Sequence, residues 1–191
     1  MIADPDKVML WAAAVLCFFG FFRAGEICLP TLTAFKQEKH LSWGDVSVDS
    51  ITSPNILRVK LKKSKTDQLG HGADVFVGKT ECPICPVAGV LAYMVTRGNQ
   101  AGPFFRFQDR KPLTKPAFTK EIRTVLETIG LPYQNFAGHS FRIGAATAAA
   151  KAGLEDSTIR TLGRWNSSAF LTYIRMPRDH LAKFSALLSQ K

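Results

Sequence analysis

The sequence predicts a mainly helical α+β domain with one small antiparallel sheet inserted after the first helix. Long apolar or alanine-rich stretches, punctuated by Pro and Gly, occupy both ends of the chain and indicate helices. A short region of alternating hydrophobicity lies between them and indicates strands. With 191 residues, 46% of them hydrophobic, the chain can fill a core of its own. We therefore expect a domain that folds without stabilising cross-links.

The first helix is expected over residues 8–22, after a start signal at Asp4, Pro5 and Asp6. Its residues are apolar on every face, which is typical of a helix enclosed by other elements. The run is shorter than the roughly 20 residues that cross a bilayer, so we expect a buried helix and no membrane segment. Arg23 is expected at its end.

The sheet is expected between residues 30 and 80. Residues 46–48 alternate in hydrophobicity, residues 56–61 read as a strand, and residues 75–77 read as its returning partner. The polar stretch from residue 66 to Gly72 would form the hairpin turn between the last two strands.

Helices account for most of the remainder. Pro86 and Pro116 are typical of helix starts, and Gly130 and Gly153 are typical of positions just past helix ends. The expected helices cover residues 86–96, 115–129, 140–152, 156–162, 168–175 and 179–189.

Charge and cysteine content restrict the partner and the compartment. The formal net charge is +10 and the pI is about 9.7, which suggests a polyanionic partner such as nucleic acid, although a generally basic soluble protein fits the same charge equally well. Four cysteines without a secretory pattern indicate a reducing compartment, nucleus or cytosol. Cys82 and Cys85 form a C-x-x-C, but no second pair lies at zinc spacing, so packing at a helix start is favoured over a metal site.

Three short segments carry residue types suited to chemistry. His139 and Arg142 lie three apart at a helix start and therefore share a face. Arg23 leaves an apolar helix with Glu26 three residues on, which by itself is typical of a structural ion pair. Tyr173 follows the glycine of Gly163-Arg164-Trp165 by ten residues. Each segment alone has a structural explanation.

Taken together, in order and approximate spacing, these segments resemble the tyrosine recombinase and integrase family across nearly the whole chain. Several further motifs resemble the recombinases of eukaryotic DIRS and Ngaro type retrotransposons. Those motifs are Ser64-Lys65-Thr66-Asp67-Gln68, Cys85-Pro86-Val87, His139-Ser140-Phe141-Arg142-Ile143-Gly144-Ala145-Ala146 and Leu162-Gly163-Arg164-Trp165. The resemblance implies the tyrosine recombinase (DNA breaking-rejoining) catalytic fold.

The resemblance also implies catalytic roles for particular residues. Tyr173 would attack the scissile phosphate, and Arg23 and Arg142 would clamp its charge with planar guanidinium forks. His139 would accept the tyrosine proton or orient the phosphate. Lys65 would protonate the leaving 5′ oxygen.

The residues leave two questions open: which lysine is the general acid, and which residue of the last motif contacts the phosphate. Lys65 shares strand parity with Leu57, Val59 and Leu61, which points it toward the core side, and Lys63 shares that parity as a rival. The family has His or Trp directly after the last glycine, whereas this chain has Arg164 and then Trp165. Either could contact the phosphate, or Trp165 could pack beneath the tyrosine helix.

The family keeps bond energy in the phosphotyrosine, so the resemblance implies no cofactor and no metal. Basic residues on one strand face and just beyond it, Arg58, Lys60, Lys62 and Lys63, are candidates for DNA-backbone contacts, although a solvated strand edge explains them equally well. The expected partner is double-stranded DNA, with no small-molecule substrate and a nuclear location inferred from that partner.

We expect residues 1–191 to form the catalytic domain without the family's N-terminal helical clamp. Residues 179–191 would form a C-terminal helix that docks on a neighbouring protomer, giving tetramers on DNA and a monomer in free solution, although packing on its own chain is equally compatible with their spacing. Two other functions fit the same motifs: a domesticated mobile-element protein that only binds DNA, and a type IB topoisomerase-like enzyme.

Overall fold

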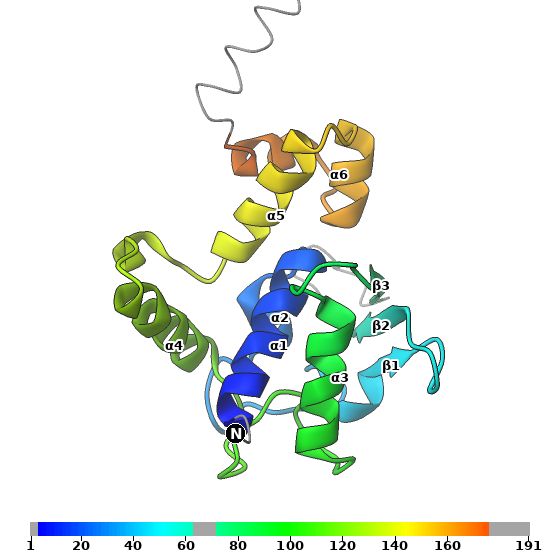
Figure 1. The fold of residues 1–191 in the computed structure, drawn as a ribbon, viewed down its shortest axis with the longest axis vertical. Coiled ribbons are helices and arrows are strands. Elements are labelled where there is room, and N and C mark those ends of the chain that lie inside the picture. The colour runs from blue at the N-terminus through cyan, green and yellow to red at the C-terminus, as the bar shows by residue number, and fades with distance from the viewer. Residues whose placement is uncertain (1–3, 63–71, 176–191) are drawn as a thin grey trace, which may run out of the picture.

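The computed structural model describes residues 4–62 and 72–175, and it has the mainly helical architecture with a small sheet that the sequence predicts (Figure 1). The elements follow in this order: α1 (Pro5–Phe19), α2 (Ala24–Ile27), η1 (Trp43–Asp45), β1 (Val46–Val48), β2 (Ile56–Leu61), β3 (Ala73–Gly78), α3 (Pro86–Arg97), α4 (Lys115–Thr128), η2 (Tyr133–Asn135), α5 (Ser140–Lys151), α6 (Asp156–Leu162) and η3 (Ser168–Tyr173).

Helix α1 is buried as predicted, but it ends three residues earlier. Asp4 caps its start by accepting a hydrogen bond from the backbone N–H of Asp6 at 2.9 Å, and Pro5 occupies the first turn. The helix stops at Phe19 because the chain turns through Gly20 and Phe21, whose φ of 53° is left-handed. Arg23 is therefore not at the end of α1, which corrects the prediction; it is the N-cap residue of α2.

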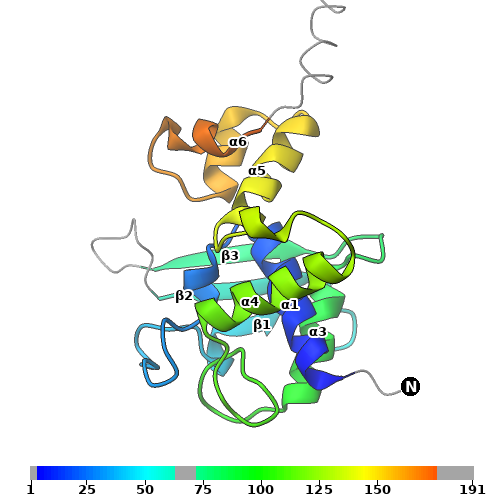
Figure 2. The same cartoon turned by 90° about the vertical axis from the view of Figure 1, so that its left-hand side faces the viewer.

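Helices α1 and α3 pack side by side in opposite directions (Figure 1). Gly89 makes the close approach possible, since a Cβ there would lie 3.2 Å from both Trp11 and Val15. Helix α4 lies on the other side of α1 (Figures 1 and 2). No helix in the described part of the chain is long and apolar enough to span a membrane.

The sheet has the order β1-β2-β3 with both pairs antiparallel, and all three strands lie where the sequence predicts them. Its central strand alternates strictly: Leu57, Val59 and Leu61 are buried, whereas Arg58 and Lys60 are exposed. The turn expected around residue 66, together with Lys63 and Lys65, lies outside the described residues.

A second, smaller core lies at the other end of the molecule, where α5, α6 and η3 pack together (Figure 2). It is built on Phe21, Ala146, Ile159, Trp165 and Phe170. Helix α5 contacts α1, so Phe21 and Phe18 join the two ends of the molecule.

The predicted helices at the C-terminal side are confirmed with one correction. Helices α5 and α6 match the expected ranges within one residue, and Gly153 has the left-handed φ of 80° that its position after α5 requires. The segment expected as helix 168–175 is instead a 3₁₀ helix that ends at Tyr173. The helix expected at residues 179–189 lies outside the described residues.

Candidate functional site

A cleft of about 880 Å³ lies between the two ends of the molecule and is lined by residues from segments far apart in the sequence. Arg23, His139 and Tyr173, three of the predicted site residues, line it together. Its other walls are Gly25, Glu26, Cys28, Pro30, Lys39, His40, Lys115, Gly138, Ile143, Thr172 and Arg175. Four further basic residues or histidines line the cleft beside the predicted ones: Lys39, His40, Lys115 and Arg175.

Arg23 is held by Glu26, as its three-residue spacing predicts. One guanidinium nitrogen lies 3.0 Å from Glu26 Oε1, and the backbone N–H of Arg23 donates to Oε2 at 2.8 Å. The Glu26 side chain is only 6% exposed, whereas that of Arg23 is 24% exposed. The carboxylate thus fixes the arginine from behind and leaves part of the guanidinium open to the cleft.

Arg164 contacts the same carboxylate from the other side. Its Nη2 lies 3.2 Å from Glu26 Oε2, and its Nη1 donates to the carbonyl of Gly20 at 3.0 Å. Burial lowers the pKa of Arg164, and Glu26 opposes that shift. Arg164 has a left-handed φ of 55° and is not among the residues that line the cleft. Its contacts tie the turn after α1 to the start of α2.

Arg142 is fully buried at the base of the site. Its guanidinium donates to the carbonyl oxygens of Phe21, at 2.5 Å, and Gly163. It lies 4.1 Å above the Trp165 ring, a cation–π contact. Burial, reinforced by the nearby positive charge of Arg23, lowers the pKa of Arg142 to about 10. Arg142 is therefore enclosed by backbone carbonyls and Trp165, and it is not among the residues that line the cleft.

Trp165 packs against other aromatic side chains in the second core. Its ring centroid is 5.4 Å from that of Tyr173 and 6.1 Å from that of Phe170. Gly163 makes room for the indole, since a Cβ there would lie 1.5 Å from its ring. The sequence left two roles open for Trp165, and in the structure its ring packs against the tyrosine segment. The buried Nε1 of Trp165 has no hydrogen-bond partner among the described residues.

Tyr173 is the last residue of η3 and is half-buried. The hydroxyl group of Thr147 on α5 donates a hydrogen bond to the backbone carbonyl of Tyr173 at 3.3 Å. The oxygen of that Thr147 hydroxyl accepts a hydrogen bond from the backbone N–H of Arg175 at 3.0 Å. These two bonds hold the chain from Tyr173 to Arg175 against α5. Tyr173 lines the cleft, and within the described residues its phenolic hydroxyl makes no hydrogen bond.

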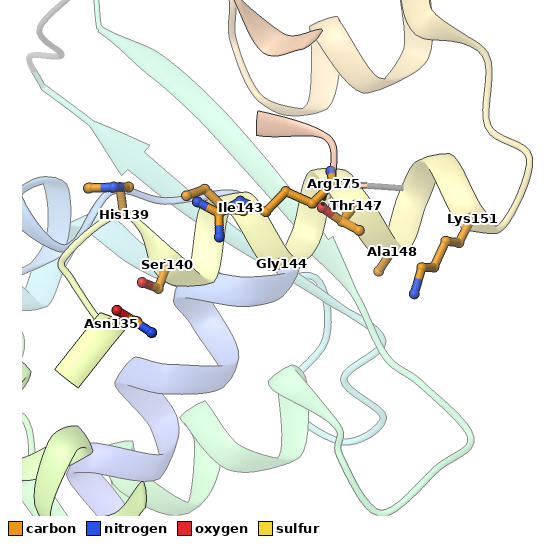
Figure 3. A pocket seen from close by; sticks show the side chains of 9 residues that line it. All are labelled: Asn135, His139, Ser140, Ile143, Gly144, Thr147, Ala148, Lys151 and Arg175. Carbon is orange, nitrogen blue, oxygen red and sulfur yellow. Dashed lines mark hydrogen bonds between the residues drawn. The ribbon is translucent and has the colours of Figure 1, made fainter. Parts of the chain in front are cut away.

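His139 precedes α5 and is exposed at the junction of two hollows. Besides the cleft, it lines a groove of about 380 Å³ along one face of α5, together with Thr147, Lys151 and Arg175 (Figure 3). Figure 3 shows Arg175 extending along α5 toward Ile143. A polar, cationic surface therefore continues from the cleft along α5.

Lys115 is a cleft residue that the sequence reading missed. It begins α4, and its backbone N–H donates to the carbonyl of Leu29 at 2.8 Å, which brings the start of α4 beside the cleft wall. Its side chain runs across Gly138, where a Cβ would lie only 2.7 Å from Lys115 Cε. The ammonium group makes no ion pair in the described part of the chain. The one available signal was Gly138, whose missing side chain leaves the space that Lys115 fills.

The predicted DNA-binding cations of the sheet differ in their surroundings. Arg58 is exposed and pairs with Asp74 at 2.6 Å, and Lys60 is exposed on the same face. Lys62 instead pairs with the buried carboxylate of Asp45 at 2.6 Å and donates to the carbonyl of Gln37 at 2.5 Å. The structure thus uses Lys62 to hold the loop before β1.

No group of three or more His, Cys, Asp or Glu side chains within residues 4–62 and 72–175 is arranged to hold a metal ion. The cleft is lined by guanidinium, ammonium and imidazole groups, and Glu26, Cys28, Thr172 and the phenol of Tyr173 also line it. The cationic groups suit an anionic ligand that accepts several hydrogen bonds, and the phenol can act as a nucleophile toward such a ligand.

Comparison with known proteins identifies the fold. No family model matches the chain. Over 169 residues it is 27% identical to a protein of Selenomonas ruminantium described as "Integrase/recombinase xerD homolog", a match that covers 85% of this chain and 44% of that protein. The chain thus spans less than half the length of this curated relative.

Solved recombinase structures superpose on the whole chain. The XerA recombinase has a TM-score of 0.67 at 16% identity, with 63% of its chain covered. The XerH site-specific recombinase bound to its palindromic difH substrate has a TM-score of 0.70 at 12% identity, with 48% of its chain covered. The fold is therefore that of a tyrosine recombinase catalytic domain, and the findings support a relationship to the tyrosine recombinase and integrase family. They leave the resemblance to DIRS and Ngaro type recombinases untested.

Proposed function

We propose that this chain breaks and rejoins double-stranded DNA through a covalent link between Tyr173 and a 3′ phosphate. One observation carries the proposal: a single cleft is lined by Tyr173, Arg23, His139 and Lys115, which come from four separate segments. The recombinase fold supports this function, as does the net charge of +10, which suits a polyanionic duplex.

The reaction is a phosphoryl transfer without hydrolysis. The Tyr173 oxygen bonds to phosphorus, the bond from phosphorus to the 5′ oxygen breaks, and the phenolic proton passes to His139. The 5′ oxygen takes a proton from a lysine, either Lys65 or the cleft residue Lys115. Religation reverses these transfers when a 5′ hydroxyl attacks the phosphotyrosine.

Arg23 would bind the non-bridging phosphate oxygens, because its partly exposed guanidinium is already fixed by Glu26. Arg142 would act from below through its positive charge, and a direct contact with phosphate would require it to release the carbonyl of Phe21. The left-handed turn at Phe21 is the place where such a release would occur.

A DNA-binding module without chemistry is the second candidate, and the burial of Arg142 favours it. Arg142, one of the two arginines expected to clamp the phosphate, donates hydrogen bonds to backbone carbonyls instead. Such a module would still bind DNA in a salt-dependent way through its exposed cations.

A nicked suicide substrate separates the two functions, because the cleaved fragment diffuses away and traps the covalent complex. We expect a protein–DNA adduct on a denaturing gel with the wild-type chain and none with Tyr173→Phe, which keeps the ring on Trp165. Tyr133→Phe, on the α4 side, is the matched control and should form adduct normally. An adduct that persists in Tyr173→Phe would overturn the proposal, and salt-dependent binding without any adduct would establish the module instead.

We also infer an origin in a mobile element of the DIRS or Ngaro type, nuclear action, and assembly into tetramers on DNA. The four short motifs support the origin, and the DNA substrate supports the location. Light scattering with and without a duplex tests the assembly: a stable tetramer without DNA would contradict it.

A further inference from the structure

Two cysteines meet at the link between the sheet and α3, away from the cleft residues described above. Cys82 is exposed, and Cys85 is 7% exposed at the start of α3. The remaining cysteines, Cys17 and Cys28, are buried in the main core. Cys82 is therefore the one exposed thiol among the four, and the buried thiol of Cys85 follows it three residues later.

Both sulfurs converge on Thr80. Cys82 Sγ lies 3.5 Å from Thr80 Oγ1 and 3.5 Å from the carbonyl oxygen of Ile84. Cys85 Sγ accepts a hydrogen bond from the backbone N–H of Thr80 at 3.5 Å. The two residues are three apart in the sequence, and both sulfurs contact the same residue, which places the two thiols in one neighbourhood.

The surroundings of Cys85 favour a thiolate. Cys85 is the N-cap residue of α3, and its sulfur also accepts the N–H of Ala88 at 3.5 Å. Burial raises the pKa of Cys85, but the N–H donors of Ala88 and Thr80 together outweigh it, so the net pKa is lowered. Desolvation acts unopposed on Cys17 and Cys28 and raises the pKa of both thiols well above the ordinary value.

We propose that Cys82 and Cys85 form an oxidisable dithiol that low-molecular-weight disulfides, such as glutathione disulfide, convert to an intramolecular disulfide. The exposed Cys82 thiolate attacks the reagent, forms a mixed disulfide and expels one glutathione thiolate. Cys85 then attacks the Cys82 sulfur, forms the protein disulfide and expels the second glutathione. Two protein thiols lose two electrons and two protons, which reduce one glutathione disulfide to two glutathiones.

The experiment exposes the folded chain to glutathione disulfide, quenches with acid, alkylates and maps the peptides by mass spectrometry. We expect a Cys82–Cys85 disulfide with mixed disulfide below about a tenth of the product, because the second thiol is held next to the first. Cys17 and Cys28 should stay reduced and should react with alkylating reagent only after denaturation.

Two variants identify the role of each sulfur. Cys85→Ser should stop at a glutathione adduct on Cys82, and it should fold, because serine is a favourable N-cap residue. Cys82→Ser should react at least about tenfold more slowly, because Cys85 is shielded. A wild-type chain that accumulates the Cys82 adduct without closing the disulfide, or that stays reduced while an unfolded control oxidises, would refute the proposal.

Discussion

Glu26 stands between two arginines, and its buried carboxylate is the negative charge that both contact. Arg23 approaches one side at 3.0 Å and Arg164 the other at 3.2 Å. Because the carboxylate is 6% exposed and Arg164 17% exposed, removing the negative charge leaves a poorly solvated cation behind.

We expect Glu26→Gln to lower the free energy of unfolding by about 3 kcal/mol, in the range for breaking a buried ion pair. Urea unfolding measures this loss. Glu127→Gln, on the exposed side of α4, is the control and should change stability by less than about 0.5 kcal/mol. Equal losses in both variants would show that Glu26 does not hold the two arginines.

Lys115 tests whether the cleft cations act in chemistry. We expect Lys115→Ala to slow adduct formation roughly 100- to 1,000-fold, the effect of removing one charge-stabilising donor. Lys120→Ala is the matched control, because Lys120 lies on the same helix and lines a different hollow. The rate of adduct formation at saturating DNA separates chemistry from binding, and a similar rate for the two variants would count against the role of Lys115.

The sequence predicted which residues belong to the site better than it predicted where their side chains point. Arg23, His139 and Tyr173 were predicted and do share one cleft. The direction of Arg164 could not be predicted, because it depends on a left-handed backbone at a non-glycine residue and on Glu26, 138 residues earlier. Lys115 was missed because its approach to the cleft depends on the long-range bond to Leu29.

The turn after α1 is the element that places Arg23, and Gly20 controls it. A Cβ at Gly20 would lie 2.2 Å from the Phe22 ring and 3.0 Å from the Leu16 carbonyl oxygen. The fully buried Phe22 cannot move aside without disturbing the core.

We expect Gly20→Ala to destabilise the chain by about 2 kcal/mol, the cost of overpacking. Gly25→Ala is the matched control five residues on: nothing lies within 4 Å of its Cβ position, and alanine favours helix, so stability should hold or rise. Thermal or urea unfolding compares the two, and an unchanged Gly20→Ala variant would show that the turn adapts.

Helices that are bounded by Pro and Gly could be predicted from the sequence. The helix ends and helix types that depend on tertiary contacts could not. The Pro and Gly signals predicted α3, α4, α5 and α6 to within about one residue. The end of α1 was missed because its apolar run continues to Phe22, beyond the last helical residue. The tyrosine segment, expected as a helix over residues 168–175, is a 3₁₀ helix that ends at Tyr173, where Thr147 on α5 binds the Tyr173 carbonyl and the Arg175 N–H.

The whole molecule has two cores with a cationic cleft between them. Arg23, Lys39, Lys115 and Arg175 all line that cleft. If these four cations neutralise four phosphates, counterion release gives a slope in log K against log salt of about −3.6, which is four times −0.9.

We expect the affinity of Tyr173→Phe for a duplex, measured by fluorescence anisotropy between about 50 and 200 mM KCl, to fall with a slope of about −3.6 or steeper. This variant avoids cleavage during the titration. Lys115→Ala in the same background should make the slope shallower by about 1. A slope between 0 and −1 would contradict a cleft that holds the DNA backbone.

The most direct measurement identifies the residue and the DNA end in the covalent complex. The chain is trapped on a nicked duplex, digested with protease and nuclease, and the nucleotide-bearing peptide is sequenced by mass spectrometry. We predict a nucleotide joined through its 3′ phosphate to Tyr173, with a free 5′ hydroxyl on the released strand. Attachment to another residue, or through a 5′ phosphate, would contradict the proposed chemistry.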